Sequence, residues 1–201
     1  MSLKLRLAAL WMPEGTMRKM LEKVDEATTA ALDDLVRRCG GRSPIPASGD
    51  GRAVRTMEES MAAMASGHNT RVKALVDAVG KARAVELGRQ ALYPVGVMLG
   101  REAKKELSVG DGPQELELAA RVLYRALGIH FGLEMRNGGT MLMRVDRCAL
   151  SHHYSREACL VLSAVDEGVV AGLSPGYSML FEQRMTGGSD VCVACIKEGR
   201  K

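Results

Sequence analysis

The hydrophobic pattern of this 201-residue chain changes its period near residue 128, and that change determines the expected fold class. Up to Leu127 the apolar residues recur every three or four positions, as they do in amphipathic helices. From Ile129 onwards, short runs appear in which apolar and polar residues alternate, which is typical of half-buried strands. The sequence therefore predicts an α+β fold in which a helical layer packs on a small antiparallel sheet.

Glycine and proline divide the helical part. Gly40 and Gly41 are expected to end the first long helix, because glycine readily adopts the left-handed conformation of a helix cap. Pro94 is expected to interrupt a later one, since proline removes a backbone donor and clashes with the preceding turn. Asn69 is a candidate N-cap. The predicted helices cover residues 16–39, 57–67, 69–92, 95–107 and 114–127.

The sequence pattern after residue 128 predicts several strands and one helix. Asn137 and the two glycines after it favour a tight hairpin turn, because Asn-Gly accepts the positive φ angles that such a turn needs. A second hairpin turn is expected at the Gly-Gly-Ser-Asp run of residues 187–190. The expected strands cover residues 129–136, 140–147, 177–185 and 191–197, and the expected helix covers residues 151–172.

The expected domain organisation is one compact domain in two parts. Residues 1–112 form a helical N-terminal part, and residues 113–201 form an α+β ligand-binding core. Prolines, glycines and serines without periodicity predict a flexible loop near residues 40–55.

Composition narrows the function classes. The net charge of +4 comes from interspersed acids and bases, and only 3% of residues are aromatic, so nucleic-acid binding is not expected. The N-terminal apolar run is too short for a signal peptide, and no run approaches the roughly 20 apolar residues of a membrane span. We therefore expect a cytoplasmic protein, in which the five cysteines are free thiols or metal ligands and do not form a disulfide frame.

Four of those cysteines lie in the last third of the chain and raise the question of a zinc site. A strong zinc signature has two Cys-x-x-Cys pairs, whereas this chain has one, Cys192 and Cys195. The alternative is that the thiols are buried and act as small hydrophobes. The side chains available as zinc ligands are Cys148, Cys159, Glu182 and Cys192, with His152 or His153 as substitutes.

The order of elements in this last third resembles a known family. A hairpin, a cysteine, a helix with Asp-Glu, a proline turn, a strand with Glu and a Gly-Ser-Asp-x-Cys strand resemble the L-2-amino-thiazoline-4-carboxylic acid hydrolase-like family. They also resemble the related 4-vinyl-reductase-type ligand-binding domains, whose fold is shared with Golgi transport tethering subunits. The chain departs from these patterns where Ser163 and Met185 replace expected cysteines. The matching positions are Cys148, Asp166, Glu167, Pro175, Phe181, Glu182 and residues 188–192.

The resemblance implies a small organic molecule in a pocket between the helical layer and the sheet. In the hydrolase interpretation Cys148 is the nucleophile, and His152 or His153 is its base, because a nearby imidazole activates a thiol. Asp166 would orient the base or bind a substrate amine, and Arg184 would pair with a substrate carboxylate.

Two other interpretations stay open. The first is a non-catalytic small-molecule sensor or carrier, in which Cys159, Glu182, Arg184 and Cys192 contact the ligand. The second is a tethering-type interaction protein that uses its helices to form a homodimer.

Overall fold

The computed structural model describes residues 2–42, 56–136 and 139–199. Most of the loop expected near residues 40–55 and the turn at Asn137 therefore lie outside the described residues. The helices and strands, in chain order, are α1 (Leu3–Leu10), α2 (Glu14–Arg38), α3 (Met57–Val79), α4 (Lys81–Leu107), α5 (Pro113–Ala126), β1 (Ile129–Met135), β2 (Thr140–Cys148), the 3-10 helix η1 (Ala149–His152), α6 (Arg156–Leu173), β3 (Tyr177–Gln183), the 3-10 helix η2 (Met185–Gly187) and β4 (Cys192–Glu198).

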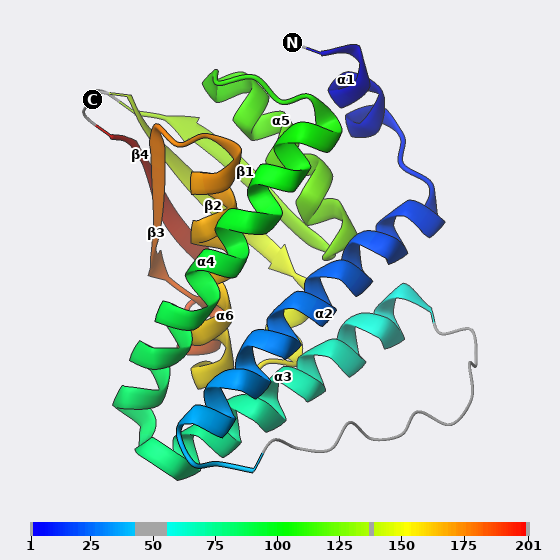
Figure 1. Ribbon diagram of the computed structural model, residues 1–201. Helices are drawn as coiled ribbons and strands as arrows, with labels where there is room; N and C mark the ends of the chain where they lie inside the picture. The colour runs from blue at the N-terminus through cyan, green and yellow to red at the C-terminus, as the bar shows by residue number, and fades with distance from the viewer. Residues whose placement is uncertain (1, 43–55, 137–138, 200–201) are drawn as a thin grey trace.

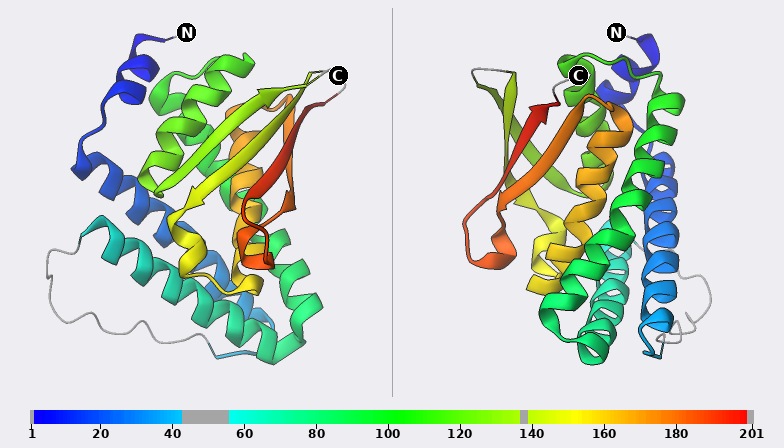
Figure 2. Two further views of the ribbon diagram at one scale, coloured as in Figure 1. Left: turned by 180° about the vertical axis from the view of Figure 1, so that it is seen from behind. Right: turned by 60° about the vertical axis from the view of Figure 1, so that its left-hand side comes forward.

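These elements form the expected α+β architecture (Figure 1). The sheet is antiparallel with strand order β1-β2-β4-β3. Helix α6 lies between the sheet and α4, and α2 packs on the far side of α4 (Figure 2). Helix α5 covers the part of the sheet near β1. The prediction of a helical layer on a small antiparallel sheet is confirmed.

The helix boundaries correct the sequence-based expectations at Asn69, Pro94 and Gly80. Helix α3 runs without a break past Asn69, whose side chain instead accepts a hydrogen bond from the Ser155 N–H (2.9 Å) and donates one to the His153 carbonyl (2.7 Å). Helix α4 continues through Pro94, because its packing on α6 outweighs the loss of one backbone donor. The chain instead breaks at Gly80, whose φ of 79° is a conformation that favours glycine.

The helix expected from residue 151 begins later. Residues from Ala149 form η1, and α6 begins at Arg156 because the Ser155 hydroxyl accepts a hydrogen bond from the Ala158 N–H (3.1 Å). At the end of α2, Gly40 has a φ of 77°, which confirms the expected glycine cap.

Helices α4 and α6 pack backbone against backbone. Gly96 and Gly100 on α4 face Gly168 and Gly172 on α6, and each pair is spaced four residues apart on one helix face. A Cβ atom at Gly168 would lie 2.9 Å from the Gly96 Cα and would also overlap the Tyr93 carbonyl oxygen. Only glycine therefore allows this close approach, and it holds α6 firmly in place behind the sheet.

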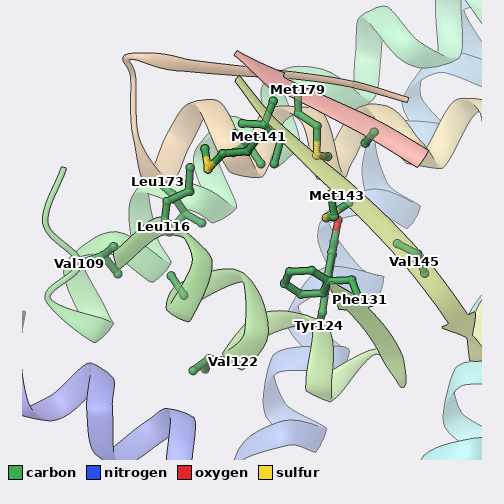
Figure 3. Close-up of a cluster of buried hydrophobic side chains, with 14 of the residues drawn as sticks. Val109, Leu116, Val122, Tyr124, Phe131, Met141, Met143, Val145, Leu173 and Met179 are labelled. Carbon is green, nitrogen blue, oxygen red and sulfur yellow. The ribbon is translucent and has the colours of Figure 1, made fainter. Parts of the chain in front are cut away.

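The main core fills the space between the sheet, α5 and α6 (Figure 3). Methionines from three positions on the strands, Met141, Met143 and Met179, lie beside the α5 and α6 side chains. The rings of Tyr124 and Phe131 meet edge to face with centroids 5.4 Å apart, the geometry that aromatic pairs prefer. This core places Tyr124 at the border of the cavity described next.

Candidate ligand-binding pocket

A cavity of about 100 Å³ lies between helices α2, α3, α5 and α6 and the end of the sheet near η1. A second hollow of about 100 Å³ and a third of about 30 Å³ adjoin it, and Tyr124 and Asp166 border all three. The surface of the first cavity is largely carbon. Its lining residues are Val24, Thr28, Met64, His68, Tyr124, Leu127, Ile129, Val145, Cys148, Leu150, Ser151, Tyr154, Cys159, Leu162, Ser163, Val165, Asp166, Phe181, Arg184, Thr186 and Cys192.

Asp166 on α6 is the carboxyl group that borders all three hollows. Burial raises the pKa of its carboxyl to about 7, and the charge of Glu167 adds to the shift. A hydrogen bond from the Tyr124 hydroxyl and the charge of Arg184 oppose it. Asp166 is partly buried and lines all three hollows, where a ligand could reach it.

A chain of hydrogen bonds joins Thr28, His68 and Tyr154 along another wall of the cavity. The Thr28 hydroxyl donates to the Val24 carbonyl (2.7 Å), so it accepts from the His68 Nε2–H (2.8 Å). The Nδ1 atom of His68 then accepts from the Tyr154 hydroxyl (2.8 Å). Burial, aided by the charge of Arg71, lowers the pKa of His68 to about 4, which keeps the ring neutral. The Tyr154 oxygen is left with acceptor capacity toward the cavity.

Arg184, at the end of β3, belongs to a network of charges behind the cavity. Its Nη2 atom donates to the Ser163 hydroxyl (3.0 Å), and its guanidinium lies over the Phe181 ring, 5.2 Å from the centroid. Glu167 accepts from Arg89 (2.6 Å) and lies 3.9 Å from Arg184. The positive charge of Arg184 is thus partly balanced within the protein. The pairing of Arg184 with a substrate carboxylate stays a prediction.

Three of the thiols also line the cavity: Cys148, Cys159 and Cys192. Burial raises the pKa of Cys148 to about 12 and raises the pKa of Cys159. The backbone N–H of Met185 donates a hydrogen bond to the Cys192 sulfur (3.4 Å). At neutral pH Cys148 is therefore a protonated thiol, which is a weak nucleophile.

The structure brings together five of the eight residues proposed from the sequence. Cys148, Cys159, Asp166, Arg184 and Cys192 line the cavity.

The other three proposed residues lie elsewhere. His152 and His153 are exposed and line a separate groove, and Glu182 is exposed on β3. Within residues 2–42, 56–136 and 139–199, no group of three or more His, Cys, Asp or Glu side chains is arranged to hold a metal ion. The four zinc candidates are thus not brought together as one ligand set.

Sequence reasoning missed the wall formed by Thr28, His68 and Tyr154. A signal for two of them was present, because Thr28 and His68 interrupt the apolar faces of their helices. Thr28 is four residues from both Val24 and Leu32, so it lies on the buried face of α2. A polar residue at such a position has to find a partner, and the position can mark a functional site.

Comparisons with known proteins identify the fold. No protein-family model matches the sequence, and no curated protein matches it. The structure is similar to that of a trafficking protein particle complex subunit 3 from Naegleria fowleri covalently bound to palmitic acid, with a TM-score of 0.56 and 12% identity over 71% of this chain and 97% of that one. It is also similar to the phenol-responsive sensory domain of the transcription activator PoxR with phenol. The TM-score is 0.50, the identity is 17%, and the match covers 84% of this chain and 89% of that one.

The chain shares the α+β fold of these proteins. This agrees with the fold implied by the resemblance to 4-vinyl-reductase-type domains and Golgi tethering subunits. The thiazoline hydrolase family itself is not matched. Among the described residues, no helix has the length and apolar character needed to span a membrane.

Proposed function

We propose that this chain binds a small, largely apolar organic molecule that carries one hydrogen-bonding group, and that it acts as a sensor or carrier domain without chemical turnover. The proposal rests on the cavity beneath the sheet. Its surface is largely carbon, but the Tyr154 hydroxyl and the Asp166 carboxyl lie at its border. Binding sites for small molecules commonly combine an apolar lining with a few fixed polar groups.

The size of the cavity favours a molecule of about one ring. A dry apolar cavity of about 150 Å³ is known to hold benzene. The first cavity measures about 100 Å³, and the neighbouring hollow across Tyr124 and Asp166 offers a similar volume. A ring with a short substituent would therefore extend from the first cavity into the neighbouring hollow.

The polar wall favours a ligand with a hydroxyl or an amine. Because the Tyr154 hydrogen is donated to His68, its oxygen can accept a hydrogen bond from the ligand. Asp166, with a pKa of about 7, can accept from a hydroxyl or become ionised next to a ligand cation. A purely hydrocarbon ligand would leave both groups without this extra partner.

The two proteins of similar fold support this class of ligand. One is the phenol-responsive domain of PoxR with phenol, and the other carries palmitic acid, so this fold accommodates molecules that are mostly hydrocarbon with one polar end.

The state of the thiols favours binding over hydrolysis. In the hydrolase interpretation Cys148 attacks as a thiolate, yet burial keeps it protonated at neutral pH. The two histidines proposed as its base, His152 and His153, line a different hollow. Ring-opening hydrolysis of a thiazoline carboxylate therefore stays a prediction that the cavity does not support.

The test uses phenol and toluene as probes, with melting temperature and titration calorimetry as readouts. We expect phenol to stabilise the protein and to bind more tightly than toluene, which has a methyl group in place of the hydroxyl. Ligand at 100 times its dissociation constant stabilises by about 2.7 kcal/mol. Leu162→Phe fills the cavity and should abolish binding, whereas the control Leu180→Phe lies on the exposed side of β3 and should not. Equal phenol affinity in both variants would refute the site.

A further inference from the structure

A wide groove lies on the outer side of η1, and among the described residues only Ile129 lines both this groove and the ligand cavity. Its volume is about 790 Å³, which falls in the usual range for small-molecule sites, roughly 300 to 1,000 Å³. Helices α3 and α5, strands β1 and β2 and the η1 segment contribute to its walls. The lining residues are Glu58, Met61, Arg121, Arg125, Gly128, Ile129, His130, Phe131, Arg147, Ala149, His152 and His153.

The lining of the groove is rich in basic residues. It has three arginines and one carboxylate, that of Glu58, and its three histidines add further hydrogen-bonding groups. The Arg121 charge is balanced, because Glu117 accepts two hydrogen bonds from it (3.0 and 2.7 Å). His130 is paired with Asp146 at 2.7 Å.

Two guanidinium groups in the groove have no direct carboxylate partner among the described residues. Arg125 donates to a neutral carbonyl, that of Ala9 (2.6 Å), and among the described residues no carboxylate pairs with it or with Arg147. Arg147 is exposed on β2 and stands opposite His130 in the strand register.

The pairing of strands β1 and β2 is also irregular beside the groove. The register of β1 and β2 shifts between His130 and Phe131, so Asp146 has no partner of its own in the strand pairing. Such a bulge bends a strand and redirects its side chains, and bulges are frequent beside binding sites. The irregularity occurs where Arg147 and His130 turn toward the groove, and the regular pairing resumes along the rest of both strands.

We propose that this groove is a second binding site, which takes a small polyanion with two phosphate-like groups. Guanidinium groups match the geometry of phosphate and carboxylate oxygens and bind them through paired hydrogen bonds. Arg125 and Arg147 supply two such groups, and His152 and His153, which the ligand cavity does not use, supply further donors at the rim. This site is independent of the proposed function of the cavity.

The experiment is calorimetric titration of the whole protein with inorganic pyrophosphate at low salt. Arg147→Glu should weaken binding about tenfold or more, because it replaces a charge-assisted donor with a repelling carboxylate. Arg144→Glu is the matched control, since it changes the net charge equally on the same strand but lies outside the groove. It should change the dissociation constant less than about twofold.

Three results would overturn the proposal. The first is an absence of measurable pyrophosphate binding to the unaltered protein. The second is an equal loss of affinity in Arg147→Glu and Arg144→Glu, which would indicate attraction to net charge alone. The third is acetate binding as tightly as pyrophosphate, which would exclude a site for a polyanion. Both substituted residues are exposed, so neither substitution removes a buried contact.

Discussion

Replacing Asp166 with asparagine should stabilise the protein, and the gain should grow as the pH rises. The folded state raises the pKa of this carboxyl from 3.8 to about 7, chiefly by burial. Well below pH 3.8 the group is protonated in both the folded and unfolded states and contributes no difference. As the pH rises toward 7, ionisation favours the unfolded state, so wild-type stability is progressively lost.

The magnitude follows from the shift. Each pKa unit corresponds to about 1.4 kcal/mol, so Asp166 lowers the free energy of unfolding by about 4 kcal/mol above pH 8 and by about 2 kcal/mol at pH 5. The asparagine side chain would keep an oxygen as acceptor for the Tyr124 hydroxyl and has no charge to bury. The advantage of Asp166→Asn over wild type should therefore increase by about 2.5 kcal/mol between pH 5 and pH 8.5.

Urea unfolding of both proteins at several pH values measures this difference. The comparison has to be a difference, because the lowered pKa of His68 works in the opposite direction: its stabilisation is complete above pH 6.5 and is lost as the pH falls toward 4. That contribution is common to both proteins and cancels. Glu182→Gln, which removes an exposed carboxylate, serves as the control for the loss of one negative charge. A flat or falling difference for Asp166→Asn would show that Asp166 is not held in a dry site.

Three further substitutions or modifications test other parts of the structure. Tyr154→Phe leaves the buried His68 Nδ1 without its hydrogen-bond donor and should lower the free energy of unfolding by about 1 to 3 kcal/mol in the same urea assay. The control Tyr93→Phe, on the exposed side of α4, should change the free energy of unfolding little. Gly168→Ala should destabilise the protein by about 3 kcal/mol or more in thermal melts, because the added methyl group meets the backbone of α4. The control Gly15→Ala has open space around it and should be neutral or should stabilise the protein by up to about 1 kcal/mol. Cys148 should react with iodoacetamide at pH 7.5 far more slowly in the folded protein than in urea, as followed by mass spectrometry, and rapid labelling of the folded thiol would restore the nucleophile interpretation.

The sequence was sufficient for the fold class because the hydrophobic period is a local property. The switch from three-to-four spacing to alternation near Gly128 coincides with the start of β1 at Ile129. Helix boundaries were less predictable, since long-range packing decided them. Pro94 was expected to break a helix, but its neighbours in α4 are held against α6 and the helix continues.

The site was predictable only in part for a similar reason. Cys148, Asp166 and Arg184 could be proposed because their residue types suggest chemistry and because they occur in a recognisable order. Nothing local indicates that His68 on α3 meets Tyr154, since 86 positions separate them in the sequence. Their hydrogen bond depends on how α3 packs beside α6, which is a property of the assembled fold.

The glycine contact between α4 and α6 also limits how the cavity can change. A wall built from side chains can be trimmed or enlarged one residue at a time, but at Gly96 and Gly168 the two helices already meet through their backbones. This contact fixes the position of α6. Because α6 carries Cys159, Leu162 and Asp166, the positions of these three residues are fixed together. Relatives of this protein with different ligands should therefore differ mainly in α2, α3 and η1, and engineering of its specificity should begin there.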